Sequence, residues 1–181
     1  SRSTGKIERH FVGAATMMAD WTPNFSFVRV RIPESQTWRS DRCTGAPHNV
    51  GQGIGAPLWQ GMQIYTPSEG MRPVLTKAAG DWGNTSVEYV TKDYWRISCI
   101  SSIPSGGQGF KATSPDGITY QFTELRSGRD RQFPTARYTR SAPKIWTTHV
   151  LLYASKIEDA HGNWVQFDYS DTSKAGPTRI H

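Results

Sequence analysis

Apolar and polar residues alternate regularly in two stretches of the second half of the chain, and each stretch follows a compact turn. Between residues 164 and 169 every second residue is apolar, which is the period of a strand with one buried face. The turn before this stretch contains Gly162 and Asn163, which supply the positive-φ positions of a tight turn. We therefore expect a hairpin in which residues 150–157 pair with residues 164–170.

The same arrangement occurs earlier in the chain, where a Ser-Pro-Asp-Gly turn at residues 114–117 precedes the alternating residues 118–123. Two hairpins of one design indicate an internal repeat, and Asp116 precedes Asp159 by 43 positions. Aspartate side chains in turns hydrogen-bond to their own backbone, so both carboxylates are interpreted as turn formers. The residues expected to shape the turns are Asp116, Gly117, Asp159, Gly162 and Asn163. The residues expected to pack on the sheet are Tyr120, Phe122, Trp164, Phe167 and Tyr169.

The rest of the chain shows the strand period and many turn signals, with little sign of helix. Further strand candidates are residues 25–32, 59–66, 86–91 and 94–100, and a two-residue loop, Lys92-Asp93, joins the last two. The sequence thus predicts an all-β protein, a meander of antiparallel hairpins with long loops. The Gly/Ser-rich residues before the repeats mark the best internal boundary. We divide the chain into a β-rich segment, 1–105, and the repeated hairpins, 106–181, with one continuous domain as the alternative.

Composition fits a sheet protein with an aromatic core. Of the 181 residues, 36% are hydrophobic and 12% aromatic, while 17 Gly and 11 Pro indicate many turns. Each aromatic side chain buries a large area, so aromatics stabilise a sheet that has few Leu and Ile. The chain has no run of 18 apolar residues and no charged start followed by an apolar stretch. We therefore expect no membrane segment and no signal peptide, and the atypical first residues suggest a piece of a longer protein.

Charge and tryptophan content leave two binding alternatives open. A net charge of +6 suits a nucleic-acid or acidic-glycan binder, but Arg and Lys are scattered except in residues 126–140. Scattered charge is typical of a solvated surface, so nucleic acid is not the favoured partner. Exposed Trp residues on strands offer a sugar-stacking platform, although such positions more often pack against the sheet. The candidates for this platform are Trp59, Trp82, Trp95, Trp146 and Trp164.

No arrangement of residues indicates catalysis, a cofactor or a metal. The five His residues are far apart, and His161 beside Asp159 is interpreted as a polar turn residue. Glu158 and Asp159 are adjacent in an extended chain, so they point to opposite faces rather than toward one substrate. The Gly-rich residues 51–55 lack the Lys-Ser/Thr of a phosphate-binding P-loop. We therefore expect a protein that is not an enzyme.

Cys43 and Cys99 are the two cysteines of the chain. They can form a disulfide or remain two buried thiols, and no CxxC motif points to a structural zinc. If they are joined, the closed loop of about 55 residues stabilises the fold by about 3–4 kcal/mol in the chain-entropy model. Both alternatives stay open at the level of the sequence.

The two hairpin sequences resemble those of the RHS/YD-repeat proteins, the large shells of bacterial polymorphic toxins and toxin complexes. One resembling stretch is Ser-Pro-Asp-Gly-Ile-Thr-Tyr-Gln-Phe at residues 114–122. The other is residues 157–169, which contain an Asp-x-x-Gly-Asn motif followed, after five residues, by Tyr169. The likeness extends upstream to residues 41–43, 59–61, 95–99 and 107–110, and so covers most of the chain from residue 25 onward.

This resemblance implies a structural piece of a β-sheet that spirals into a hollow shell around a toxic C-terminal polypeptide. The piece would lie near the N-terminal end of the RHS core, and nothing in it matches the family's C-terminal protease or toxin motifs. The implied partners are the rest of the shell and the enclosed toxin. The implied route is secretion, or delivery by a bacterial system such as type VI secretion in bacterial competition. An open strand edge after His181 is also expected to pair with another copy.

Overall fold

The computed structural model describes residues 25–33, 36–45, 59–76, 88–127, 133–134, 146–170 and 177–181. These residues form eleven strands and, within the described ranges, no helix. The strands are β1 (Phe27–Pro33), β2 (Trp59–Thr66), β3 (Gly70–Thr76), β4 (Tyr89–Val90), β5 (Arg96–Ile100), β6 (Gly109–Thr113), β7 (Thr119–Ser127), β8 (Phe133–Pro134), β9 (Trp146–Glu158), β10 (Trp164–Asp168) and β11 (Arg179–Ile180). This architecture confirms the predicted all-β fold class and the meander of hairpins.

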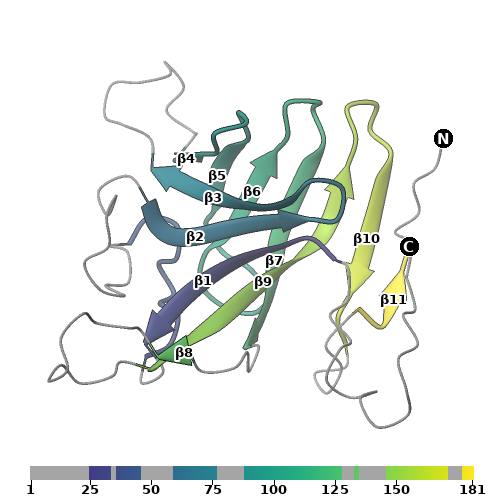
Figure 1. Ribbon diagram of the computed structural model, residues 1–181. Coiled ribbons are helices and arrows are strands. Elements are labelled where there is room, and N and C mark those ends of the chain that lie inside the picture. The colour runs from purple at the N-terminus through teal and green to yellow at the C-terminus, as the bar shows by residue number, and fades with distance from the viewer. Residues whose placement is uncertain are drawn as a thin grey trace, which may run out of the picture.

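Eight of the strands form a closed, barrel-like sheet. Strands β1 to β7 pair in succession, each antiparallel to the next, and β7 then pairs with β9. Strand β9 also pairs with β1, from Phe27↔Tyr153 to Pro33↔Thr147, and this pairing closes the sheet. In Figure 1, β1, β2 and β3 cross in front of the strands β4 to β7, and β10 and β11 extend the sheet on the right. The closed sheet therefore includes strands from both predicted segments, 1–105 and 106–181.

Alternating side chains fill the interior of the closed sheet. In β1, for example, Val28, Val30 and Ile32 are buried, whereas Arg29 and Arg31 lie on the outer face. The largest fully buried side chains are Trp95, Phe110, Phe122, Ile32, Ile64, Ile97 and Leu152. Aromatic residues thus supply much of the core volume, as the composition predicts.

The predicted strands differ from the observed ones mainly around residues 86–100. Strand β2 has the predicted bounds, but β4 contains only Tyr89 and Val90, and residues 86–87 of that prediction lie outside the described part. The predicted two-residue loop is wrong, because the Thr91 N–H donates to the Trp95 carbonyl at 3.2 Å and encloses three residues. The third of these, Tyr94, has a φ of +69° and adds a residue to the turn.

Candidate functional site

The two turns singled out from the sequence share one backbone geometry. In the first, the Ser114 N–H donates to the Ile118 carbonyl at 2.8 Å, and the Gly117 N–H donates to the Ser114 carbonyl at 3.0 Å. In the second, the Asp159 N–H donates to the Asn163 carbonyl at 2.8 Å. The Gly162 N–H donates back to the Asp159 carbonyl at 3.2 Å. Gly117 and Gly162 take φ values of +82° and +85°, as a three-residue loop requires of its last residue.

The side chain of the first residue completes each turn. Ser114 Oγ accepts the Ile118 N–H at 3.1 Å, and Asp159 Oδ1 accepts the Asn163 N–H at 2.9 Å. Ser114 is therefore the counterpart of Asp159, and the true offset between the turns is 45 positions (159 − 114) rather than 43. Asp116, expected to be that counterpart, lies exposed at the tip of its loop instead. The sequence pattern paired Asp116 with Asp159 because both are aspartates. The hydrogen bonds instead pair Ser114 with Asp159, the first residue of each turn.

Asp159 makes more hydrogen bonds than Ser114 because its carboxylate has two oxygens. Besides the Asn163 N–H, it accepts the His161 N–H at 2.8 Å on Oδ1 and Asn163 Nδ2 at 2.8 Å on Oδ2. These hydrogen bonds, of which the one from the Asn163 side chain has the largest effect, lower the pKa of Asp159. Asp159, Gly162 and Asn163 thus lie together in one turn, whose hydrogen bonds use both carboxylate oxygens of Asp159.

Two further loops share this geometry, which sequence reasoning missed: it expected a two-residue loop at the first and a Gly/Ser-rich boundary at the second. Between β4 and β5, the Tyr94 N–H donates to the Thr91 carbonyl at 3.1 Å, and Thr91 Oγ1 accepts the Trp95 N–H at 3.1 Å. Between β5 and β6, the Ile103 N–H donates to the Gly107 carbonyl at 3.0 Å, and Gly106 has a φ of +86°. A polar residue four positions before the end of the loop was the available signal at Thr91, but the tyrosine at the left-handed position concealed it.

The β4–β5 loop is fixed at its base by Arg72 of β3, another residue that the sequence did not single out. Its buried guanidinium donates to the Glu69 and Asp93 carboxylates and lies 5.1 Å from the Trp95 ring centroid. Burial by itself would raise the pKa of Asp93, but hydrogen bonds from Thr91, its own backbone and Arg72 lower it overall. These charges therefore belong to one ion-pair cluster that joins the β2–β3 and β4–β5 turns.

Tyr120 and Phe122 lie where packing residues are expected. Phe122 is fully buried and Tyr120 nearly so, with 0% and 8% of their surfaces exposed. The Tyr120 ring lies 5.2 Å from Trp95 and 6.1 Å from Phe122, centroid to centroid. Both side chains point into the closed sheet, so they are core residues of β7.

Strand β9 changes partners along its length, and this change defines a junction between the closed sheet and β10. Its residues up to Tyr153 pair with β1, whereas Lys156 to Glu158 pair with β10. At the change, the Ala154 N–H donates to the Ser26 carbonyl at 3.0 Å, just before β1 begins. The closed sheet therefore opens at Ala154, and β10 and β11 lie outside it (Figure 1).

Tyr169 anchors the chain that leaves the closed sheet. Its hydroxyl donates to the Ala154 carbonyl at 2.8 Å, and its ring stacks on Tyr153 with centroids 6.0 Å apart. Arg126 donates to the Tyr169 carbonyl at 2.8 Å and pairs with Glu124 at 2.9 Å. Burial raises the pKa of the Tyr169 hydroxyl, so it remains a donor at neutral pH. The last residue of the sequence motif thus ties β10 to the point where β9 changes partners.

Phe167 also packs at this junction, but Trp164 does not pack as expected. The Phe167 ring meets Phe25 edge-on, with centroids 5.5 Å apart. Trp164 is 51% exposed, and Lys156 Nζ lies 5.7 Å from its ring centroid. Trp164 follows the turn at the far end of β10 from the junction, so the body of the closed sheet does not cover it. Its predicted packing role is replaced by a contact with one lysine.

The outer edge of β10 is only partly paired. Strand β11 covers Phe167 and Asp168, and Gln166 exchanges backbone hydrogen bonds with His181 at 3.0 and 3.2 Å. Among the described residues, no strand pairs with Trp164 and Val165 on the side away from β9. Val165 is 37% exposed. This stretch of β10 is an unpaired edge beside two exposed apolar side chains.

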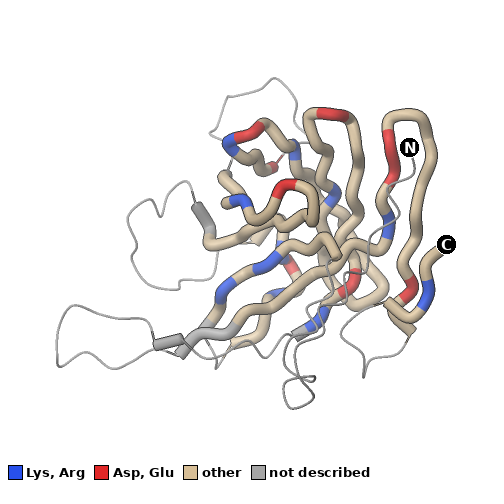
Figure 2. The backbone as a smooth tube through the Cα atoms, turned by 45° about the vertical axis from the view of Figure 1, so that its right-hand side comes forward, with Lys and Arg blue, Asp and Glu red and all other residues tan. Residues whose placement is uncertain are grey.

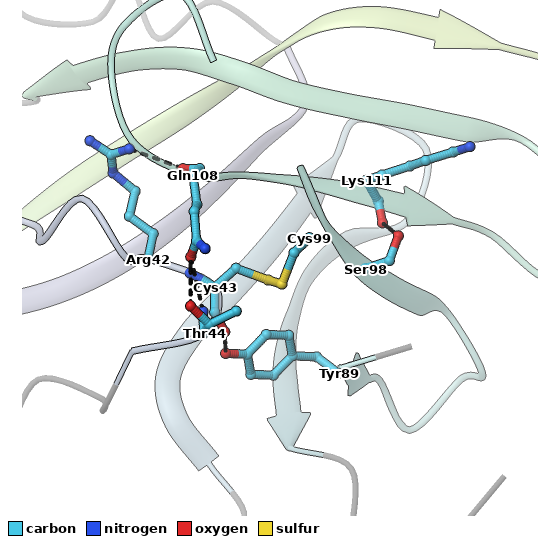
Figure 3. The surroundings of a disulfide bond; sticks show 8 residues. All are labelled: Arg42, Cys43, Thr44, Tyr89, Ser98, Cys99, Gln108 and Lys111. Carbon is cyan, nitrogen blue, oxygen red and sulfur yellow. Dashed lines mark hydrogen bonds between the residues drawn. A yellow bond between two sulfur atoms is a disulfide. The ribbon is translucent and has the colours of Figure 1, made fainter. Parts of the chain in front are cut away.

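The structure joins Cys43 and Cys99 in a disulfide, a point the sequence left open. Their Cα atoms lie 5.6 Å apart, and the bond links the segment of residues 36–45 to β5 (Figure 3). The Tyr89 hydroxyl donates to the Cys43 carbonyl from below. Burial, with a smaller effect of Glu88, raises the pKa of Tyr89 to about 12, so this donor is protonated at neutral pH.

Charge is interspersed over the described residues. Figure 2 shows Lys and Arg spread over several strands, and Asp and Glu mostly at the turns and strand ends. Most of the basic run at residues 126–140 lies outside the described part. Within that part, His, Cys, Asp and Glu side chains do not gather in groups of three that could hold a metal. No helix among the described residues is long and apolar enough to cross a membrane.

The Trp residues proposed for sugar stacking differ in how accessible they are. Trp95 is 1% exposed and belongs to the core, whereas Trp164 remains accessible. The side chains of Trp59, Trp82 and Trp146 lie outside the described part.

We found no matching family model, curated protein or solved structure for this chain.

Proposed function

We propose that this chain is a non-enzymatic structural segment of an RHS/YD-repeat protein, whose β-sheet wall encapsulates and carries a C-terminal toxin. The observation that carries the proposal is the change of partner along β9, from β1 to β10. A sheet that closes on itself cannot grow, whereas a sheet that leaves the closed part has an edge to which further hairpins can add. In this proposal the closed sheet forms one end of the wall, and the edge of β10 is where further hairpins add.

The repeated turns support a wall built from stacked hairpins. Two of the hairpins with this loop geometry have neighbouring tips, and Figure 1 shows the β6–β7 and β9–β10 tips side by side at one end of the sheet. A Cβ added to Gly117 would lie 3.2 Å from the Ala160 Cβ, so the two tips are in contact. Neighbouring repeats stabilise each other through such contacts, as in other repeat proteins.

The closed part of the sheet is filled by its own side chains. Ile64, Phe122 and Leu152 are fully buried in its interior. A carried polypeptide would therefore lie against the wall that continues beyond β10. In this proposal the described segment is a solid cap at one end of a hollow shell.

The disulfide agrees with a protein that leaves the bacterial cytoplasm. Disulfides persist in oxidising compartments and are rare in the cytosol of most organisms. Cys43 and Cys99 are joined, and no free cysteine is present. This supports the proposed secretion, or delivery by a bacterial secretion system.

Protease protection in the full-length parent protein tests the encapsulation role. We expect the C-terminal polypeptide to survive a protease concentration that digests it when it is expressed alone. Combining Arg126→Ala with Tyr169→Phe should weaken the junction and expose the C-terminal polypeptide, while Tyr94→Gly at a remote exposed loop should leave it protected. Equal digestion of the C-terminal polypeptide with and without the rest of the protein would contradict encapsulation.

Exposed Trp164 favours one alternative, a carbohydrate-binding module. Its indole is 51% exposed, and the neighbouring Lys156 and Gln166 can donate hydrogen bonds to sugar hydroxyls. Binding on a glycan array that disappears in Trp164→Ala would support this alternative. Unchanged binding in that variant, or no binding at all, would remove it.

A further inference from the structure

The segment of residues 36–45 covers one side of the aromatic core. Trp38 in this segment is 7% exposed and stacks on Phe110, with ring centroids 6.0 Å apart. Phe110 is 1% exposed and also meets the Tyr89 ring at 6.2 Å. If the segment moved away, Trp38 would leave Phe110, and the outer side of this aromatic cluster would meet water.

Hydrogen bonds between this segment and residues 106–108 align it against the sheet. Gln108 Oε1 accepts the backbone N–H groups of Cys43 and Thr44, both at 3.1 Å (Figure 3). Arg42 Nη1 donates to the Gly106 carbonyl at 2.6 Å and to the Gln108 carbonyl at 2.9 Å. The Gln108 N–H donates to the Ser40 carbonyl at 2.7 Å. These contacts hold Cys43 in register with Cys99.

The hydrogen bonds and the disulfide respond differently to their surroundings. Thr44 is exposed, so water competes for its hydrogen bond to Gln108, whereas the hydrogen bonds of Arg42 and of the Cys43 N–H are partly buried. Water does not compete with the disulfide, because the disulfide is a covalent bond. It therefore restricts how far the segment can move from β5. Its loss would therefore change the closed fraction of the segment more than the loss of any one hydrogen bond.

We propose that the Cys43–Cys99 disulfide is a redox-sensitive clasp, which holds residues 36–45 over the core under oxidising conditions and releases them under reducing conditions. Cys43 is 2% exposed, whereas Cys99 is only partly buried, so an incoming thiolate reaches Cys99 more readily. The clasp does not depend on the wall proposal, because its parts all lie within the closed sheet and the segment above it.

The reductant is a small thiol such as glutathione. Its thiolate forms a bond to Cys99 Sγ while the Cys43–Cys99 bond breaks, and Cys43 Sγ takes the electron pair and then a proton. A second thiolate attacks the small molecule's sulfur in the mixed disulfide and frees Cys99, which is also protonated. The protein disulfide gains two electrons, and two small thiols become one disulfide. When the released segment returns to the sheet and re-forms its hydrogen bonds to Gln108, Cys43 lies beside Cys99 again, so the same steps run backward under oxidising conditions.

Amide hydrogen exchange of the whole chain in reduced and oxidised glutathione tests the clasp. Reduction should speed exchange at Cys43 and Thr44 by about tenfold or more, while amides of β6 and β7 keep their protection. Re-oxidation should restore the slow exchange. The double variant Cys43→Ser with Cys99→Ser should exchange as the reduced protein does and ignore the glutathione ratio.

The variant Gln108→Ala separates the two kinds of contact. It removes the acceptor of Cys43 and Thr44 but keeps the disulfide, so its oxidised form should keep Trp38 protected from a soluble quencher of indole fluorescence. Trp38→Phe identifies the signal of that indole. The clasp would be overturned by unchanged exchange after reduction, or by simultaneous loss of protection in β6 and β7, which would make the disulfide a staple of the whole fold.

Discussion

Tyr94 occupies a left-handed backbone conformation that Gly106, Gly117 and Gly162 adopt in the other loops of the same design. A side chain there costs about 1–2 kcal/mol, and the greater freedom of glycine in the unfolded chain offsets about 0.5–1 kcal/mol of that. Tyr94 is 70% exposed, so burial adds little in return. Tyr94→Gly should therefore raise the free energy of unfolding by about 0.5–1 kcal/mol, measured by urea denaturation.

Gly162→Ala is the matched control for Tyr94→Gly. A Cβ at Gly162 meets no atom within 4 Å, so only the backbone conformation opposes it. This variant should lose about 1 kcal/mol of stability. Lower stability of Tyr94→Gly would mean that the tyrosine side chain makes contacts that outweigh its strained backbone.

Asp159 should make the stability of the β9–β10 hairpin depend on pH. Hydrogen bonds lower its pKa in the folded state below the ordinary value of about 3.9. Its contribution is therefore complete above pH 3.9 or so, and is lost as the pH falls through the lowered folded pKa. Exchange of the Asn163 amide should accelerate over that range relative to the intrinsic rate, and Asp159→Ser, which copies the Ser114 turn, should not show this acceleration. The same acid dependence in Asp159→Ser would assign the effect to another group.

At the residue scale, the sequence identified those turn residues whose type the backbone conformation of the turn requires. Gly117 and Gly162 were predictable because a positive φ strongly favours glycine. Ser114 was not, because serine is common in many settings and its role depends on which N–H reaches its hydroxyl. Tyr94 was hidden for the opposite reason, since a bulky residue in that conformation contradicts the usual preference.

Strand β10 depends on its anchor at Tyr169. Tyr169→Phe keeps the ring on Tyr153 but removes the hydrogen bond to the Ala154 carbonyl, which costs about 0.5–1.5 kcal/mol. We expect faster amide exchange in β10 and unchanged exchange in β6 and β7. The control Tyr65→Phe changes a tyrosine that stacks on Phe27 in the closed sheet, and should leave β10 unaffected. Unchanged β10 exchange in Tyr169→Phe would show that other contacts hold the junction.

At the element scale, local patterns predicted β2 and the two repeated hairpins because each is set by neighbouring residues. The change of partners in β9 was not predictable in this way. It depends on the register between β1 and β9, which pairs Val30 with Val150, 120 positions later in the chain. Alternation indicates that a strand has a buried face but does not say which distant strand lies beside it.

The isolated 181-residue chain should associate through its unpaired edge. Trp164 and Val165 lie beside open backbone groups of β10 in the described part, and such an edge is a template for another strand. Light scattering should show a mass that rises with concentration. Val165→Lys should reduce this rise, because a charge at the edge opposes strand pairing, while Tyr94→Lys at a distant loop should not. A constant monomer mass at high concentration would count against the open edge.

At the scale of the whole molecule, the all-β class followed from alternation, aromatic content and turn residues. Closure of the sheet did not follow, because it requires the first and ninth strands to meet. The proposed function rests on the opening of that closed sheet at Ala154. The disulfide also lay beyond the sequence, since two cysteines separated by 56 positions join only if the fold brings them together.

The most direct test of the central claim is the structure of the full-length parent protein by electron cryomicroscopy. We predict that the closed sheet is retained, and that further antiparallel strands continue from the edge of β10 and β11 into a wall around the C-terminal polypeptide. A map in which this edge faces solvent, with the following residues folded as a separate domain, would contradict the claim.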